Sequence, residues 1–298
     1  MASERLVGAL YVALSASSFG AMAIFARYAY GSGAEVVAVL FLRFLIAALL
    51  MTAVMIVTRR RWPAGRNLAI LAAMGGIGYV GQSFTFFSAL NHASAGLVAL
   101  LLYLYPFLVT LLGAVFLRQR LTAPRLCAVL AALAGTALTI GGGIGGEPLG
   151  IVLGMSAALI YSVYIVVGSR VMACEAPLAA ATVVMIAAAA VFGVLAATTA
   201  PAWPQGAAGW TAVLLIAVVS TVIAMVAFFA GMQKLGAADA ATLSTLEPVV
   251  TFVLAAIFLG EKIQPNQVLG GAIILGAVIW LARARPPAAT APAGAASR

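Results

Sequence analysis

The sequence predicts an all-α integral membrane protein with ten transmembrane helices, arranged as two inverted five-helix repeats. Of the 298 residues, 65% are hydrophobic and 8% are charged, whereas a soluble domain has roughly half apolar and a quarter charged residues. The apolar residues fall into runs of about 20, the length of helix that crosses a hydrocarbon core of about 30 Å. The chain also repeats itself, because Pro106 and Pro248 lie in similar segments and 248 minus 106 is 142. Composition, run length and repetition indicate the same class.

Apolar runs bounded by charged residues, glycine or proline define the expected helices in chain order. The first copy contributes 6–28, 34–58, 67–90, 93–117 and 124–141. The second copy contributes 148–172, 176–198, 209–232, 238–259 and 265–282. We therefore divide the chain into a first repeat, 1–142, a second repeat, 143–285, and an Ala/Pro-rich tail, 286–298, that we expect to be disordered and cytosolic.

The basic residues predict the orientation of these spans in a lipid bilayer. With the N-terminus in the cytosol, thirteen of the sixteen Lys and Arg residues are cytosolic; the exceptions are Arg27, Arg43 and Lys262. Cytosolic loops of membrane proteins carry such an excess of positive charge. We therefore expect both termini in the cytosol, and the net charge of +9 does not indicate a nucleic-acid partner.

The spacing of 142 residues recurs along the chain and indicates how the two copies are related. It pairs Gly8 with Gly150 and Phe19 with Tyr161, which a shared Ala/Leu/Gly-rich composition alone does not explain. Each copy has five crossings, an odd number, so the second copy must be upside down relative to the first. Inverted repeats are typical of secondary transporters, whose substrate site lies near the midplane between the copies.

Glu247 lies about nine residues into the ninth expected span, near mid-depth at about 1.5 Å per residue. Ser244, Glu247 and Thr251 share one helix face at i, i+3 and i+7, and Pro248 removes a backbone hydrogen bond that frees the Ser244 carbonyl. A carboxylate is unfavourable there unless it faces the bundle interior or a wet cavity. Two interpretations remain open: an acid that binds a substrate amine or a coupling proton, or a buried acid that holds a kinked helix to its neighbour.

Arg43 lies equally deep in the second expected span. It either meets a substrate carboxylate or has a structural role, pairing with Glu247 or with carbonyls at a helix end. We favour the structural role. Together with Arg43, the residues assigned to structural or gating roles are Phe19, Pro106 and Pro248.

Aromatic and hydroxyl side chains recur at helical spacing in three spans. Tyr and Trp usually form belts at the membrane interface, but these tyrosines lie too deep in their spans for a belt. Their rings and hydroxyls suit the wall of a cavity for a partly apolar solute. With Ser244 and Glu247, the predicted substrate-binding residues are Tyr79, Ser83, Phe86, Tyr103, Tyr105 and Tyr161.

Other kinds of site lack the residues that they require. The chain has a single histidine, His92, which we expect to be solvated in a short external turn, and two cysteines, Cys127 and Cys174, with no CxxC pair. We therefore expect no metal site and no cofactor. The spans carry no obvious Ser/His dyad, paired aspartates or metal-ligand set, so we do not expect an enzyme.

The chain resembles the drug/metabolite transporter superfamily, specifically its ten-helix EamA-type members. The segments that carry the resemblance are Thr245-Leu246-Glu247-Pro248, Leu259-Gly260-Glu261 and the downstream Gln267, Gly271 and Gly276. Tyr103-Leu104-Tyr105-Pro106 is similar to the Tyr-Leu-Trp-Pro segment of the YddG-like amino acid exporter subgroup, with Tyr105 in place of Trp.

The resemblance implies a multi-pass exporter of amino acids in a bacterial inner membrane, with broad specificity for neutral and aromatic substrates. It implies alternating access around a cavity formed by helices three, four, eight and nine, flanked by one, two, six and seven, with five and ten at the periphery. Tyr79, Tyr103, Tyr105 and Tyr161 would line the substrate path. The alternative is export of a cationic drug, a nucleoside or a sugar derivative. The residues leave oligomeric state and proton coupling open.

Overall fold

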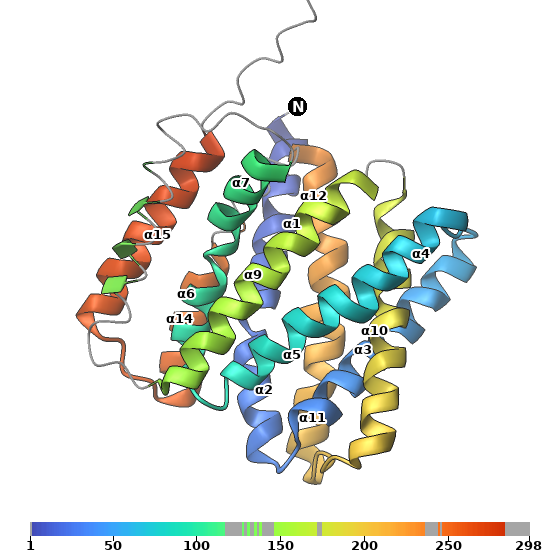
Figure 1. The fold of residues 1–298 in the computed structure, drawn as a ribbon, viewed down its shortest axis with the longest axis horizontal. Coiled ribbons are helices and arrows are strands. Elements are labelled where there is room, and N and C mark those ends of the chain that lie inside the picture. The colour runs from blue at the N-terminus through green and yellow to red at the C-terminus, as the bar shows by residue number, and fades with distance from the viewer. Residues whose placement is uncertain are drawn as a thin grey trace, which may run out of the picture.

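The computed structural model describes residues 2–116, 146–171, 175–235 and 246–283, together with residues 127, 130, 131, 134, 135, 137, 138 and 244. Regular structure in these residues is helical (Figure 1), apart from an isolated bridge between Ala93 and Gly146. The first copy contains α1 (Ala2–Gly20), α2 (Met22–Gly31), α3 (Val36–Val57), α4 (Gly65–Ala73), η1 (Met74–Tyr79), α5 (Val80–Ala89), α6 (Ala95–Leu102) and α7 (Tyr105–Phe116). The second contains α9 (Pro148–Val171), α10 (Pro177–Thr199), α11 (Gly206–Ala217), η2 (Val218–Ile223), α12 (Ala224–Leu235), α14 (Leu246–Leu259) and α15 (Pro265–Arg283).

Several helical stretches among the described residues have the length and hydropathy of membrane spans. They are Leu6–Gly31, Val36–Val57, Gly65–Ala89, Leu178–Thr199 and Gly206–Phe228. These five correspond to the first, second, third, seventh and eighth expected spans, and α9 and α15 cover the sixth and tenth. The fifth, 124–141, lies mostly outside the described residues, and the tail, 286–298, lies wholly outside them. The prediction of an all-α membrane protein is confirmed.

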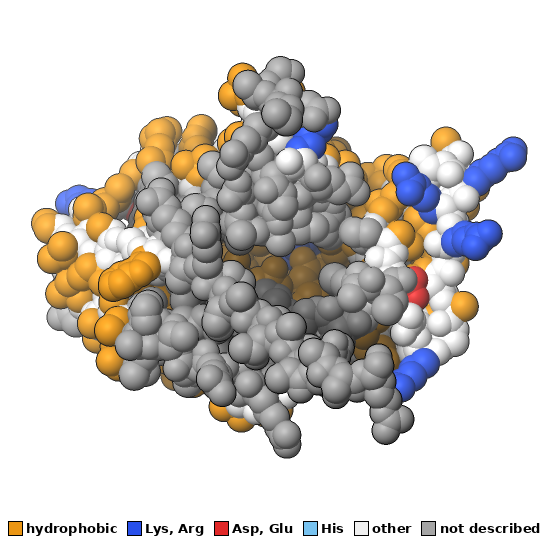
Figure 2. Space-filling view, turned by 90° about the horizontal axis from the view of Figure 1, so that it is seen from above, with side chains coloured by type: hydrophobic (Ala, Val, Ile, Leu, Met, Phe, Trp, Pro, Cys, Tyr) orange, Lys and Arg blue, Asp and Glu red, His pale blue; other side chains and the backbone are white. Residues whose placement is uncertain are grey.

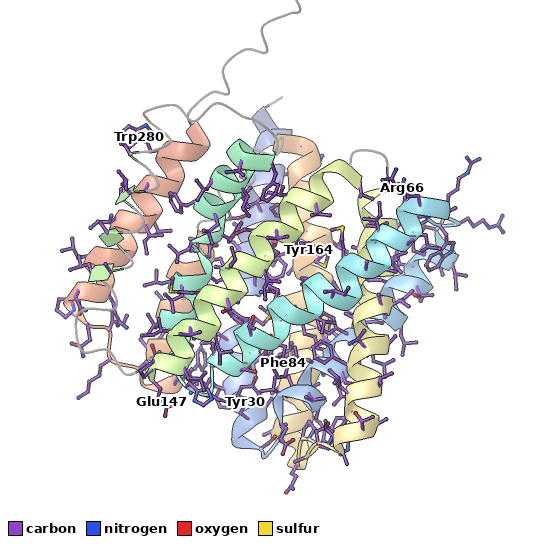
Figure 3. The ribbon with its side chains drawn as sticks, viewed as in Figure 1. Tyr30, Arg66, Phe84, Glu147, Tyr164 and Trp280 are labelled. Atoms are coloured by element: carbon purple, nitrogen blue, oxygen red, sulfur yellow. The ribbon has the colours of Figure 1, made fainter. Side chains whose placement is uncertain are left out.

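The two copies run in opposite directions. In Figure 1, α1 descends from the N-terminus at the top, whereas α9 starts at the bottom beside Glu147, which Figure 3 labels in the same view. The two copies pack against each other through three pairs of helices. α1 packs on α12, α5 packs on α9, and the second helices of the two copies, α3 and α10, pack on each other. Each first helix therefore packs on the third helix of the other copy, so the copies interlock.

Pro106 marks a helix start, which corrects the prediction of a continuous fourth span with a proline in the middle. The fourth span is broken between α6 and α7 at Tyr103 and Leu104, and Pro106 is the second residue of α7. In the first turn of a helix the missing N–H has no intrahelical partner to lose, and the ring suits the helical φ angle. Pro106 therefore begins a half-helix. Pro248 lies in α14, and Ser244 before it is also helical.

The third helix of each copy contains a π-helical segment that the sequence did not predict. Adding 142 to the bounds of η1, 74–79, gives 216–221, which overlaps η2 at 218–223. π-Helical turns are rare and occur frequently at functional sites. Because the same segment of both copies departs from α-helical geometry, the departure belongs to the repeated unit.

Figure 2 views the molecule from above, at the end where the N-terminus lies, and shows Lys and Arg side chains projecting on one side. The outer surfaces of the helices carry large hydrophobic side chains, among them Leu49, Val194 and Ile257, each more than 60% exposed. Such surfaces suit contact with lipid.

Candidate functional site

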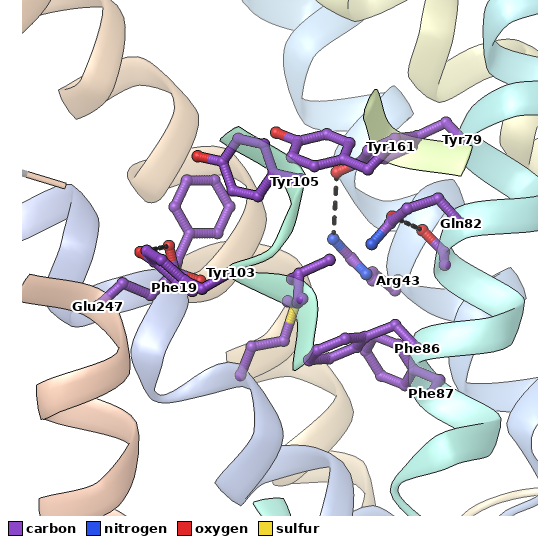
Figure 4. A pocket seen from close by; sticks show the side chains of 13 residues that line it. Phe19, Arg43, Tyr79, Gln82, Phe86, Phe87, Tyr103, Tyr105, Tyr161 and Glu247 are labelled. Carbon is purple, nitrogen blue, oxygen red and sulfur yellow. Dashed lines mark hydrogen bonds between the residues drawn. The ribbon is translucent and has the colours of Figure 1, made fainter. Parts of the chain in front are cut away.

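A small cavity of about 90 Å³ lies where the breaks in the helices meet η1 (Figure 4). Its wall comes from both copies and combines aromatic, hydroxyl and charged side chains. The lining residues are Phe19, Met22, Arg43, Tyr79, Gln82, Ser83, Phe86, Phe87, Leu102, Tyr103, Tyr105, Tyr161 and Glu247. An acid, an arginine and several tyrosines therefore face one buried space.

Most of the residues predicted to bind substrate share this cavity. Seven line it: Tyr79, Ser83, Phe86, Tyr103, Tyr105, Tyr161 and Glu247. Ser244 does not line it but accepts a hydrogen bond through its carbonyl from Tyr103. Phe19 and Arg43 also line the cavity, whereas Pro106 lies in the first turn of α7 and Pro248 lies in α14.

Four lining residues were not predicted to bind: Met22, Gln82, Phe87 and Leu102. Gln82 adjoins Ser83, so polarity in mid-span was a signal for it, and Phe87 adjoins Phe86. Met22 and Leu102 are ordinary apolar residues that reach the cavity because α2 begins and α6 ends beside it. Hydropathy could not distinguish them from core residues.

Tyrosine rings form a continuous wall between the two copies. The rings of Tyr103 and Tyr105 lie 6.0 Å apart between centroids, and Tyr105 meets Tyr161 edge-on at 4.9 Å. Tyr161 stacks on Tyr164 at 6.0 Å, and Tyr164 lies 5.6 Å from Tyr79. Aromatic pairs prefer such offset and edge-to-face arrangements. The wall therefore runs from the break before α7, across α9, to η1.

Glu247 faces the cavity from the first turn of α14. Its Oε2 accepts a hydrogen bond from the Tyr103 hydroxyl at 3.1 Å, and Oε1 has no hydrogen-bond partner among the described residues. Thr251 donates to the Gly20 carbonyl at 3.0 Å, where α1 ends. A Cβ on Gly20 would lie 2.8 Å from the Glu247 carbonyl oxygen. The acid thus sits at a tight junction between helices and still faces the cavity, so it combines features of both interpretations.

Arg43 is 2% exposed and lies across the cavity from Glu247 (Figure 4). Its Nε donates to Thr221 Oγ1 at 3.0 Å, and a terminal nitrogen donates to the Tyr79 hydroxyl at 3.4 Å. The guanidinium carbon lies 4.9 Å from the ring centroid of Phe44 and 5.2 Å from that of Phe87, within cation–π range. Of the structural roles expected for Arg43, the ion pair with Glu247 is not formed. Hydroxyls and rings hold Arg43, and no described carboxylate pairs with it.

Lining residues come from the helices that the resemblance placed around the cavity and from helices that it placed as flanking. Helices three, four and nine contribute, and so do α1, α2, α3 and α9, which belong to the flanking first, second and sixth helices. The eighth helix reaches the site indirectly, because Thr221 in η2 accepts from Arg43. The broken first helix is the physical reason, since the gap at Ala21 places Phe19 and Met22 beside the cavity.

At the end of the molecule opposite the N-terminus, two carboxylates form contacts between segments that are remote in the sequence. His92 Nδ1 lies 2.7 Å from Glu147 Oε2, and the Glu147 N–H donates to the His92 carbonyl. His92 is therefore paired and not merely solvated, as we had expected. Glu261, in the Leu-Gly-Glu segment, accepts the N–H of Ala95 at 3.0 Å, where the start of a helix favours an anion. Both contacts join one copy to the other.

Two interlocked, oppositely directed copies of an apolar helical unit around a buried polar and aromatic cavity define a multi-pass membrane transporter. The chain belongs to the EamA-like transporter family, which it matches over residues 6–141 and 148–283. The two matched ranges confirm the tandem repeat, and membership in this family identifies a transporter.

Named relatives are bacterial transporters. The uncharacterized transporter YcbK of Bacillus subtilis is 30% identical over 90% of each chain. The aromatic amino acid exporter YddG of Ancylobacter novellus is 29% identical over 66% of this chain and 68% of its own. A probable terminal-alkyne amino-acid exporter of Streptantibioticus cattleyicolor is 27% identical over 75% of this chain and 76% of its own. A solved crystal structure superposes with a TM-score of 0.66, at 25% identity, over 94% of this chain and 96% of that one.

Proposed function

We propose that the protein exports amino acids, neutral and aromatic ones with broad specificity, across a bacterial inner membrane by alternating access. The observation that carries the proposal is a partly buried acid, Glu247, in a cavity walled by tyrosine and phenylalanine rings. The carboxylate binds the substrate ammonium group, and the rings receive its apolar or aromatic side chain. Two relatives named as amino acid exporters support this substrate class.

The volume of the cavity supports a mechanism that requires movement. At about 90 Å³, it is smaller than the roughly 300–1,000 Å³ of a typical small-molecule site. Tyr105 belongs to the first copy and Tyr161 to the second, and their rings meet at 4.9 Å. Rocking one copy against the other separates these rings and widens the cavity toward one side of the membrane.

The orientation of the chain in the membrane sets the proposed direction of transport. We place both termini in the cytosol because the basic residues of the chain then lie mostly on the cytosolic side. The face at the N-terminal end carries projecting Lys and Arg side chains (Figure 2), in keeping with this orientation. Export then proceeds from this face to the end of the molecule where His92 pairs with Glu147.

Counterflow in proteoliposomes tests the substrate and the role of the acid. Labelled neutral and aromatic amino acids are offered beside a nucleoside and a cationic dye, with and without an imposed pH gradient. We expect saturable amino acid exchange that falls at least tenfold in Glu247→Gln, because a neutral amide binds an ammonium group more weakly than a carboxylate does. Val268→Ala, on the exposed face of α15, is the matched control and should exchange normally.

The results of this experiment distinguish between the possible substrates and between the possible roles of Glu247. Movement of dye or nucleoside without amino acid exchange would replace the substrate class, because an acid among aromatic rings also fits an organic cation. Loss of pH-gradient dependence in Glu247→Gln would assign it proton coupling. Normal exchange and normal coupling in that variant would contradict both functional roles of the acid.

A further inference from the structure

Arg43 connects the third helices of both copies at equivalent positions. It donates to Tyr79, the last residue of η1, and to Thr221, within η2. Since 221 minus 79 is 142, the two hydroxyls occupy the same position of the repeated unit. The position 142 residues after Arg43 is Met185, which is also buried. A single arginine thus binds both copies, and the second copy has no counterpart to it.

Each partner of Arg43 is linked to an element that must move during transport. Thr221 also donates to the Ile216 carbonyl at 2.9 Å, so its hydroxyl joins the arginine to the backbone of the eighth helix. The centroid of the Tyr79 ring lies 5.6 Å from that of Tyr164 and 5.4 Å from that of Phe44. Tyr79 therefore connects Arg43 to the wall of tyrosine rings. Arg43 therefore holds the two π-helical segments in one relative position.

The guanidinium lacks the partner that would best satisfy it. A buried charge is costly unless it is paired, and charge-assisted bonds to a carboxylate are stronger than bonds to neutral hydroxyls. No described carboxylate lies within ion-pair distance of Arg43, yet the side chain lines the cavity. The site therefore favours an incoming anionic group over the hydroxyls that it now binds.

We propose that Arg43 is the receptor for the substrate carboxylate, and that this carboxylate displaces Thr221 and Tyr79 and thereby releases both π-helical segments. The inference rests on the proposed function, because it requires a substrate that carries a carboxylate. Glu247 and Arg43 lie on opposite sides of the cavity (Figure 4), which matches the ammonium and carboxylate poles of a zwitterion. Arg43 then sets specificity and couples binding to movement.

Binding and counterflow of labelled phenylalanine and its methyl ester test the specificity. The ester keeps the ring and the ammonium group but lacks the anion. We expect wild-type protein to prefer phenylalanine at least tenfold, and Arg43→Met to lose that preference. Methionine is the residue at the equivalent position of the second copy, and a buried charge replaced by an apolar residue is often tolerated in folding.

Thr221→Val tests the displacement, since the variant keeps Arg43 and removes a competitor for it. We expect phenylalanine to bind about fivefold more tightly, the factor for one competing hydrogen bond, and the ester to bind as before. Thr221→Ser should restore wild-type affinity. Ser220→Ala is the matched control in the same π-helical segment, because its buried hydroxyl has no hydrogen-bond partner among the described residues; it should leave both affinities unchanged.

Failure of the inference differs from failure of the proposed function. Wild-type protein that binds no amino acid overturns the proposed function. Equal binding of phenylalanine and its ester by wild-type protein overturns the carboxylate receptor alone. A structural role for Thr221 predicts weaker binding of both ligands in Thr221→Val, and that result, or unchanged affinity, overturns the displacement.

Discussion

Tyr103 shows how one residue joins the halves of the site. It lies in the break between α6 and α7, and its hydroxyl is 2.7 Å from the Ser244 carbonyl and 3.1 Å from Glu247 Oε2. Pro248 has no N–H to offer that carbonyl, so a tyrosine from the other copy satisfies it. The sequence predicted that Pro248 donates no hydrogen bond to the Ser244 carbonyl, but it did not predict that Tyr103 is a donor to it.

Removing this hydroxyl should therefore affect stability and transport together. In Tyr103→Phe, the buried Ser244 carbonyl and the Glu247 carboxylate each lose a donor, at a cost of about 1–3 kcal/mol. We expect a lower unfolding temperature in detergent and slower amino acid counterflow. Tyr11→Phe, in the exposed surface of α1, is the control. An unchanged unfolding temperature would show that water replaces the lost bonds.

At the scale of elements, glycine allows η1 to approach α10. A Cβ on Gly75 would lie 2.5 Å from the Val184 carbonyl oxygen and 2.8 Å from the Val184 Cα, both backbone atoms. On Gly76 the nearest atom would be a Val191 methyl carbon at 3.4 Å. The two neighbouring glycines thus differ in whether a side chain fits.

Gly75→Ala should consequently separate η1 from α10, whereas Gly76→Ala should not. Overpacking costs about 1–3 kcal/mol, while alanine favours a helix over glycine. We expect a lower unfolding temperature and impaired exchange only in Gly75→Ala, because Tyr79 ends the displaced segment. Equal unfolding temperatures for the two variants would contradict this prediction, because they would show that α10 moves away from the added methyl group with no loss of stability.

At the scale of the whole molecule, inversion explains why the cavity draws on both copies. First helices pack on third helices of the opposite copy, and the breaks at Ala21 in the first span and at Tyr103 in the fourth lie beside the cavity. In Figure 3, Arg66 lies at the top of the molecule and Glu147 at the bottom. These two residues therefore mark opposite ends of the molecule.

Cysteine labelling tests which end faces the cytosol. In a background with both native cysteines replaced by serine, Asn91→Cys should react with an impermeant maleimide added outside spheroplasts. Arg66→Cys should react only after the membrane is permeabilised, because basic loops remain in the cytosol. Both positions are exposed. The reverse labelling pattern would invert the topology and the proposed direction of transport.

The sequence by itself determined the class of protein, the duplication and the residues available for chemistry. Hydropathy, basic loops and the spacing between Pro106 and Pro248 are properties along the chain, so no contact is needed to read them. The depth of Glu247 and of the tyrosines in their spans likewise follows from counting residues. These features predicted most of the side chains that share the cavity.

Only the tertiary structure decided which groups meet. Arg43 binds Thr221 and Tyr79 and not Glu247, and His92 pairs with Glu147. Pro106 begins a half-helix because the fourth span breaks beside the cavity. A hydrogen bond requires a distance of about 3 Å between its donor and acceptor atoms. Here these atoms lie on helices that are remote in the sequence, and hydropathy does not encode the distance between them. Packing of the inverted copies sets them.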